Sequence, residues 1–121
     1  MTTYGQYCPL ARAMELLGER WTLLVVRDLL TGTRRFNDLA RGLPRMSRSL
    51  LSKRLSTLCE AGIVRRVPRP DEGAVEYRPT EAGCALWPVV EGLLSWGARW
   101  AFDQPRGEEL DPVLLMWWIR R

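Results

Sequence analysis

The chain has 121 residues, of which 46% are hydrophobic and 26% are charged, a composition typical of one globular domain. It contains no histidine, and so lacks the commonest general base and the most frequent transition-metal ligand. The three cysteines, Cys8, Cys59 and Cys84, form no Cys-x-x-Cys pair and indicate neither a disulfide framework nor a zinc cluster. We therefore expect a protein that is not an enzyme and that holds no metal or cofactor.

Positive charge is concentrated in the middle of the chain. The net charge is +4, and residues 34–78 carry eleven Lys and Arg against five Asp and Glu. This segment predicts a surface that faces a polyanion, although an ordinary solvated surface is the alternative. No apolar run reaches the ~20 residues of a membrane-spanning helix, and the first ten residues do not have the pattern of a signal peptide. We expect a cytoplasmic protein without membrane contact.

Two helices are predicted at the start of the chain. The first covers residues 8–18, with Cys8 at the N-cap and Pro9 at the first helical position, where its missing N–H costs nothing. The second covers residues 19–32. Because it is apolar on nearly all sides, we expect it to form the buried centre of the domain.

Two further helices follow, over residues 35–44 and about residues 47–61. Ser47 is the expected N-cap of the fourth helix, and Gly62 followed by Ile63 is typical of a Schellman ending. The residues expected to face the core are Phe36, Leu39, Ala40 and Leu43 on the third helix and Leu51, Leu55, Leu58 and Cys59 on the fourth.

A hairpin is predicted over about residues 63–78. Two β-prone runs, IVRRV and AVEYRP, flank the turn sequence PRPDEG, which predicts a basic tip stiffened by proline. A long last helix is then expected from a cap at Thr80 to about Phe102, with a bend at Pro88. Apolar residues cover three sides of it, so we expect it to pack against a partner.

This order of elements predicts a winged helix-turn-helix of the mainly α (α+β) class, with a two-stranded wing and a long terminal dimerisation helix. Such a fold lays the helix after the turn, here about residues 47–61, in the major groove of DNA. Its serines allow close approach to base edges, and Lys53 can reach guanine acceptors. The arginines Arg45, Arg48 and Arg54 can reach phosphates. For Arg54 an ion pair within the chain is the alternative.

Several motifs in this order resemble the HxlR-type family of bacterial transcriptional regulators, relatives of the MarR group. They are a Cys-Pro opening, Gly-x-x-Trp followed by two leucines, RFNDL, and VEYRPTEAG, within about residues 7–101. The resemblance implies a winged helix that dimerises through its first and last helices and binds double-stranded DNA. The resemblance implies that Ser49, Ser52 and Lys53 read bases. It implies that Arg48, Arg54 and the wing residue Arg69 hold the backbone. With Arg45 and Ser47, these are the expected DNA-binding residues. The dimerisation residues would be Leu10, Leu86, Val90, Leu93, Trp96 and Trp100. A two-fold dimer predicts an inverted-repeat operator.

Cys8 matches the position that some members of this family use as a thiol sensor of electrophiles or oxidants. At an N-cap its sulfur would lie beside unpaired backbone N–H groups and the positive end of a helix dipole. That setting lowers a thiol pKa from its usual value of ~8.5. The alternative is a cysteine that only caps and packs. Cys59 and Cys84 lie within predicted helices, and we expect them to react more slowly.

The predicted function is therefore a homodimeric, sequence-specific, thiol-responsive DNA-binding transcriptional regulator formed by residues 1–103. One alternative is a protein–protein adaptor, which would carry apolar residues in place of Ser49, Ser52 and Lys53. Another is a regulator that binds a hydrophobic small molecule near the tryptophan-rich C-terminal region. Residues 104–121 contain seven consecutive apolar residues and are either a terminal helix or the start of a further domain, similar to the sterol-carrier-like domain of longer family members.

Overall fold

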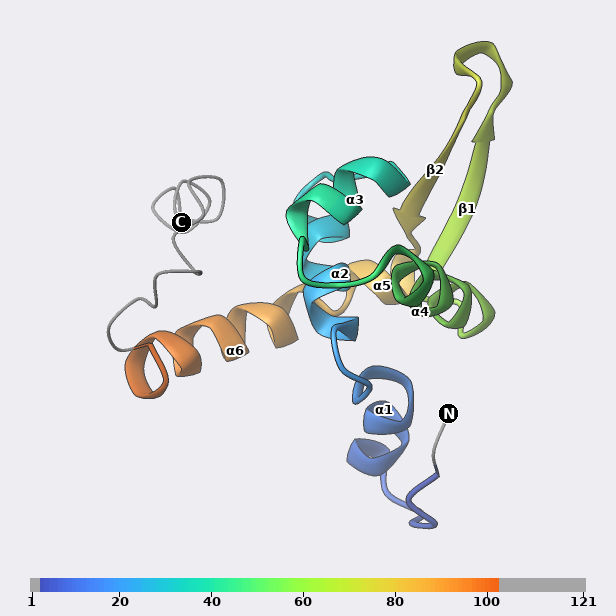
Figure 1. Cartoon of the computed structure of the whole chain (residues 1–121). Helices are drawn as coiled ribbons and strands as arrows, with labels where there is room; N and C mark the ends of the chain where they lie inside the picture. The colour runs from blue at the N-terminus through green and yellow to red at the C-terminus, as the bar shows by residue number, and fades with distance from the viewer. Residues whose placement is uncertain (1–2, 103–121) are drawn as a thin grey trace. The chain divides into compact units, whose positions relative to one another are not determined.

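The computed structural model describes residues 3–102 and is mainly helical with one two-stranded sheet (Figure 1). The elements are α1 (Pro9–Leu17), α2 (Thr22–Leu30), α3 (Phe36–Gly42), α4 (Arg48–Glu60), β1 (Val64–Arg69), the 3₁₀ turn η1 (Pro70–Glu72), β2 (Ala74–Pro79), α5 (Glu81–Cys84) and α6 (Trp87–Trp100). The predicted winged helix-turn-helix is confirmed. The chain divides into two compact units after Trp87. None of the helices within residues 3–102 is long and apolar enough to cross a membrane.

The predicted second segment, residues 104–121, lies outside the described residues, and both interpretations of it stay predictions. The same holds for the C-terminal part of the tryptophan-rich region, which was an alternative site for a hydrophobic ligand.

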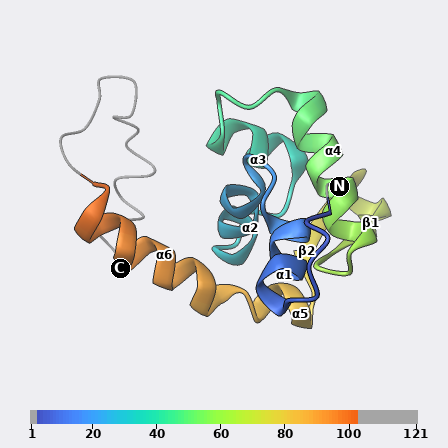
Figure 2. The same ribbon diagram turned by 90° about the horizontal axis from the view of Figure 1, so that it is seen from below.

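The core of the first unit forms around α2, which contacts α3, α5 and β2. Figure 2 shows α2 among the helices of this unit. Its residues Val25, Val26 and Leu29 are at most 2% exposed, as expected for a central helix. Leu24 is exposed, so α2 is not buried on every side. From α3 and α4 the core receives Leu39, Leu51, Leu55 and Leu58.

Both predicted ends of α4 are confirmed. The Ser47 hydroxyl accepts a hydrogen bond from the Leu50 amide at 3.1 Å, which is the N-cap interaction. At the other end Gly62 has φ +76°, and the Ile63 amide donates to the Leu58 carbonyl at 3.0 Å, which completes a Schellman motif. Because Ile63 and Val64 are buried, this turn leads the chain directly from the core into β1.

The wing is an antiparallel hairpin in which Val64 pairs with Pro79 and Arg69 with Ala74. In Figure 1 it projects beyond α4. The expected basic tip is wrong. The tip is η1, whose exposed Asp71 and Glu72 carry negative charge, whereas the arginines lie on the strands. Before α3, Arg35 forms an isolated β-bridge with Glu76 of β2. A bridge of one residue leaves no pattern in the sequence, so this contact was not predicted.

The expected long last helix is also wrong, because it is two helices. Thr80 caps α5 alone, accepting from the Gly83 amide at 3.2 Å. Pro88 has no N–H for the carbonyl of Cys84 four residues earlier, and its ring would clash with that carbonyl. The helix therefore stops at Cys84 and a new one starts at Trp87, with Pro88 at its second position, where a missing N–H is tolerated.

Candidate nucleic-acid interface

The solvent side of α4 brings together the residues predicted to read DNA bases. Ser49, Ser52 and Lys53 are exposed and follow one another at spacings of three and one residues, so they share one face of the helix. The opposite face holds the buried leucines of the core. Nearby, Arg45 is exposed in the turn between α3 and α4, and Ser47 supplies the helix cap.

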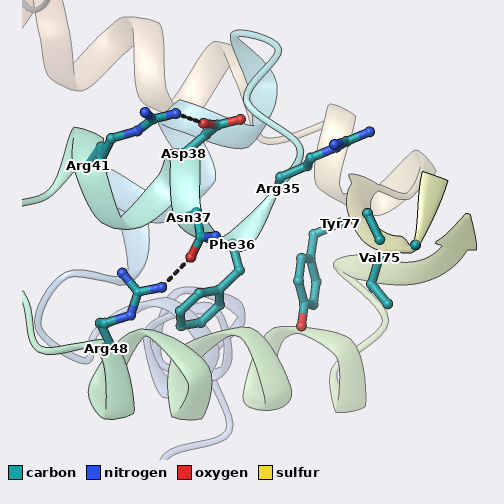
Figure 3. Close-up of a pocket in the computed structure, with 10 residues that line it drawn as sticks. Arg35, Phe36, Asn37, Asp38, Arg41, Arg48, Val75 and Tyr77 are labelled. Atoms are coloured by element: carbon teal, nitrogen blue, oxygen red, sulfur yellow. Dashed lines mark hydrogen bonds and ion pairs between the residues drawn. The ribbon is translucent and has the colours of Figure 1, made fainter.

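Arg48 is the first residue of α4 and contacts the start of α3. Its Nη2 donates a hydrogen bond to Oδ1 of Asn37, and its guanidinium carbon lies 5.2 Å from the centre of the Phe36 ring, within the range of a cation–π interaction. Figure 3 shows the Arg48 side chain beside both partners. Phe36 was expected to face the core but is only half-buried, and its contact with Arg48 was not predicted.

Arg54 makes contacts within the chain, which was the alternative to a phosphate contact. Its Nε donates to the backbone carbonyl of Arg20 at 3.0 Å, and its Nη2 lies 3.7 Å from Oε2 of Glu19, with the side chain only 13% exposed. The guanidinium faces the loop between α1 and α2, away from the exposed side of α4. We therefore do not retain Arg54 as a phosphate contact.

Arg69 belongs to a charge cluster on the wing that was not predicted. Glu76 of β2 accepts hydrogen bonds from Arg78 Nη2 at 2.9 Å and from Arg69 Nε at 3.2 Å. These hydrogen bonds, that of Arg78 first, lower the pKa of the Glu76 carboxyl from its ordinary value. One carboxylate thus balances part of the charge of two arginines. The sequence signal was Glu76 as the only acidic residue of the two wing strands, which carry four arginines.

A pocket opens between the start of α3, the start of α4 and β2 (Figure 3). Arg35, Arg41 and Arg48 line it, together with Val75 and Tyr77 of β2. Arg41 pairs with Asp38 one helical turn away, and Arg35 pairs with Glu72 of the wing tip. The pocket wall is therefore rich in arginine, but two of its three arginines are balanced by carboxylates.

The three cysteines differ in exposure. Cys8 is the N-cap of α1, as predicted, and is half-buried, and its sulfur makes no capping hydrogen bond. Burial raises the pKa of the Cys59 thiol, which fits its expected slow reaction. Cys84 is exposed at the end of α5, and its expected slow reaction stays a prediction.

Most residues assigned to dimerisation are exposed in the single chain. Leu10 of α1 and Leu93, Trp96 and Trp100 of α6 are each more than half exposed, and Leu86 is half-buried. Val90 is 5% exposed, so it offers little surface to a partner and is removed from this set.

Comparison with known proteins agrees with this architecture. Residues 16–105 match the model of the HxlR-like helix-turn-helix family. The chain belongs to this family. An uncharacterized HTH-type transcriptional regulator of Mycobacterium tuberculosis is 46% identical over 97 residues, which are 79% of this chain and 60% of that protein. The chain thus spans about 60% of the length of the mycobacterial relatives that it matches.

Solved structures of other regulators have the same fold. The reduced form of the transcriptional regulator YodB from Bacillus subtilis has a TM-score of 0.69 and 31% identity, over 83% of this chain and 100% of YodB. Quinone-bound YodB has a TM-score of 0.66 and 32% identity, over 77% and 99% of the two chains. The reduced form of the redox regulator HypR has a TM-score of 0.70 and 30% identity, over 76% and 92% of the two chains.

Proposed function

We propose that this chain is a homodimeric, sequence-specific DNA-binding transcriptional regulator. The observation that carries the proposal is the exposed face of α4, where Ser49, Ser52 and Lys53 lie together on the helix that enters the major groove in this type of fold. The relatives named as transcriptional regulators support it.

Within this proposal the residues divide into two groups. Ser49, Ser52 and Lys53 read base edges in the major groove. Arg45, Arg48 and the wing residue Arg69 contact phosphates. Ser47 caps α4, and Arg54 fixes α4 to the loop before α2.

The test is duplex binding measured against salt on fragments of the source genome. A regulator binds selected fragments more tightly than random ones, and its affinity falls as salt rises because counterions are released from the phosphates. A protein–protein adaptor with this fold binds no duplex under the same conditions, and that result would exclude the proposal.

The dimer is proposed to form through α1 and α6, whose exposed apolar residues include Leu10, Leu93, Trp96 and Trp100. Monomers rarely expose as many large apolar side chains on one helix as α6 does with Leu93, Trp96 and Trp100. An obligate interface typically buries roughly 2,000 Å² or more. Two recognition helices related by a two-fold axis would meet major grooves about 34–36 Å apart on an inverted repeat. A stable monomer at micromolar concentration in sedimentation would contradict this part.

Regulation through Cys8 is a second part of the proposal. It is supported by the position of the half-buried Cys8 at the N-cap of α1 and by the likeness to YodB, of which a quinone-bound structure exists. The Cys8 thiolate adds to a ring carbon of a quinone and forms one C–S bond. With one proton from solvent the ring becomes a hydroquinone thioether, so no other oxidant is required. The adduct shifts α1 at the dimer interface and alters the spacing of the recognition helices.

This part is tested by operator release and intact-protein mass after quinone treatment of the wild type, Cys8→Ser and Cys84→Ser. Cys84 is the matched control because it is exposed and lies outside α1. We expect release in the wild type and in Cys84→Ser but not in Cys8→Ser. Equal release in Cys8→Ser, or none in the wild type, would leave Cys8 a structural residue.

A further inference from the structure

We propose that Phe36 and Asn37, at the start of α3, are positioning residues that hold the guanidinium of Arg48 ready to bind a phosphate of duplex DNA. The inference rests on the proposed DNA-binding function and deepens it, because it names the residues that prepare one backbone contact. Neither Phe36 nor Asn37 was among the residues predicted to bind DNA.

The geometry joins two helices through one side chain. Arg48 begins α4, directly after the cap residue Ser47. It reaches back to α3, where Asn37 Oδ1 accepts a hydrogen bond from its Nη2 and the Phe36 ring lies 5.2 Å from its guanidinium carbon. A free arginine loses considerable rotamer entropy when it binds a ligand. An arginine already held in place loses less, and this favours binding.

The charges of the partners separate Arg48 from its neighbours. Arg35 is paired with Glu72, Arg41 with Asp38, and Arg69 with Glu76. In each of these pairs a carboxylate balances the guanidinium, and a phosphate would have to compete with it. The partners of Arg48 are a neutral amide oxygen and a neutral ring. Arg48 is therefore held in place by partners that do not compensate its positive charge.

Arg48 also keeps donors for a ligand. A guanidinium has five N–H donors in a planar fork, and Asn37 takes one of them. The Arg48 side chain is exposed and lines the pocket between α3, α4 and β2 (Figure 3). A phosphate oxygen that approaches this pocket from solvent can therefore meet the remaining N–H groups without displacing the amide of Asn37.

The experiment is a double-mutant cycle on duplex binding over a range of salt concentrations. Arg48→Ala is expected to reduce the slope of log affinity against log salt by about 0.9, the value for one phosphate contact. Asn37→Ala is expected to weaken binding roughly three- to tenfold, the effect of one lost hydrogen bond. In the double variant, Asn37→Ala should add no further weakening, because the residue that it positions is gone.

Two further substitutions separate positioning from a general structural role. Asn37→Asp keeps a hydrogen-bond acceptor for Arg48 but adds a carboxylate, so we expect it to lower the salt slope as Arg48→Ala does. Phe36→Tyr keeps an aromatic ring and should bind like the wild type, whereas Phe36→Leu should weaken binding only when Arg48 is present. Thermal unfolding of each variant checks that the fold is retained. Arg41→Ala is the matched control, because Arg41 lines the same pocket as Arg48 but has a carboxylate partner; it should change the slope by less than half as much as Arg48→Ala.

The outcomes distinguish this proposal from the proposed function. If the effects of Asn37→Ala and Arg48→Ala multiply in the double variant, Asn37 acts independently of Arg48 and the positioning role is wrong. If Arg41→Ala lowers the slope as much as Arg48→Ala, the distinction between neutral and carboxylate partners fails. If the wild type binds no duplex at any salt concentration, the proposed function itself is wrong, and this inference with it.

Discussion

Arg54 of α4 donates a hydrogen bond from its Nε to the backbone carbonyl oxygen of Arg20, at 3.0 Å, between residues 34 positions apart in the sequence. Its Nη2 lies 3.7 Å from the carboxylate of Glu19, and its side chain is only 13% exposed. The next residue towards the N-terminus, Lys53, is exposed. Two adjacent basic residues thus have different tasks, since one holds α4 in place and the other points to solvent.

Arg54→Ala should therefore act on stability. We expect the free energy of unfolding to fall by about 1.5–3 kcal/mol, the range for a hydrogen bond from a charged group, while the salt slope of DNA binding stays unchanged. Lys53→Ala is the control and should change stability by less than about 0.5 kcal/mol. Urea unfolding measures the free energy of unfolding of both variants. A normal unfolding curve with a reduced salt slope for Arg54→Ala would show that Arg54 contacts phosphate after all.

Lys53 and Arg69 should differ in how they affect sequence preference. Lys53→Ala is expected to cost about 1–3 kcal/mol at one base pair and to relax the preference there. Arg69→Ala should weaken binding to all sequences equally. It should reduce the salt slope by at most about 0.9, because Glu76 already balances part of its charge. Binding to a randomised site library compares them, and identical profiles would contradict the division into base-reading and phosphate-binding residues.

Glu76→Gln should change the pH dependence of stability. The pKa of Glu76 is lowered from its ordinary value of 4.5, first by the hydrogen bond from Arg78. A lowered carboxyl pKa stabilises the fold above the unfolded value, and that stabilisation is lost as the pH falls through the folded-state pKa. The melting temperatures of wild type and variant should therefore differ at pH 7, and the difference should shrink as the pH falls below the ordinary carboxyl value of 4.5.

The same variant should also bind DNA differently at neutral pH. Without the carboxylate, the positive charges of Arg69 and Arg78 are no longer compensated within the wing. The slope of log affinity against log salt should therefore become steeper. A difference in melting temperature that stays constant between pH 7 and pH 3 would mean that the charge of Glu76 does not contribute to stability.

Gly83→Ala should be more damaging than Gly62→Ala, although only Gly62 has a positive φ. A Cβ on Gly83 would lie 2.3 Å from the carbonyl oxygen of Ile63, so α5 would have to move away from the turn between α4 and β1. We expect a cost of about 3 kcal/mol. At Gly62 no atom lies within 4 Å of the added Cβ, and the cost is the left-handed strain of about 1–2 kcal/mol. Thermal unfolding compares the stabilities of the two variants. If Gly62→Ala were the less stable one, α5 would be able to move without a large cost.

The sequence by itself determined the features that depend on neighbouring residues. The Ser47 cap and the Gly62 turn each involve a few consecutive positions, so both ends of α4 could be predicted. The succession of helices and strands then indicated the winged fold and the exposed face of α4. The break before Pro88 is also a local feature. The sequence predicted a bend there, but the proline ring would clash with the Cys84 carbonyl, so the helix ends instead.

Only the tertiary structure decided which arginines remain available to a ligand. The partners of Arg54, Arg35 and Arg48 lie 34, 37 and 11 positions away in the sequence, and no local pattern brings them together. An arginine and a carboxylate interact according to their separation and exposure in space, which depend on how α3, α4 and the wing pack. The number of positive charges in residues 34–78 could therefore be read from the sequence, but the packing determined that Arg54 is a structural residue and that Arg48 is held by neutral partners.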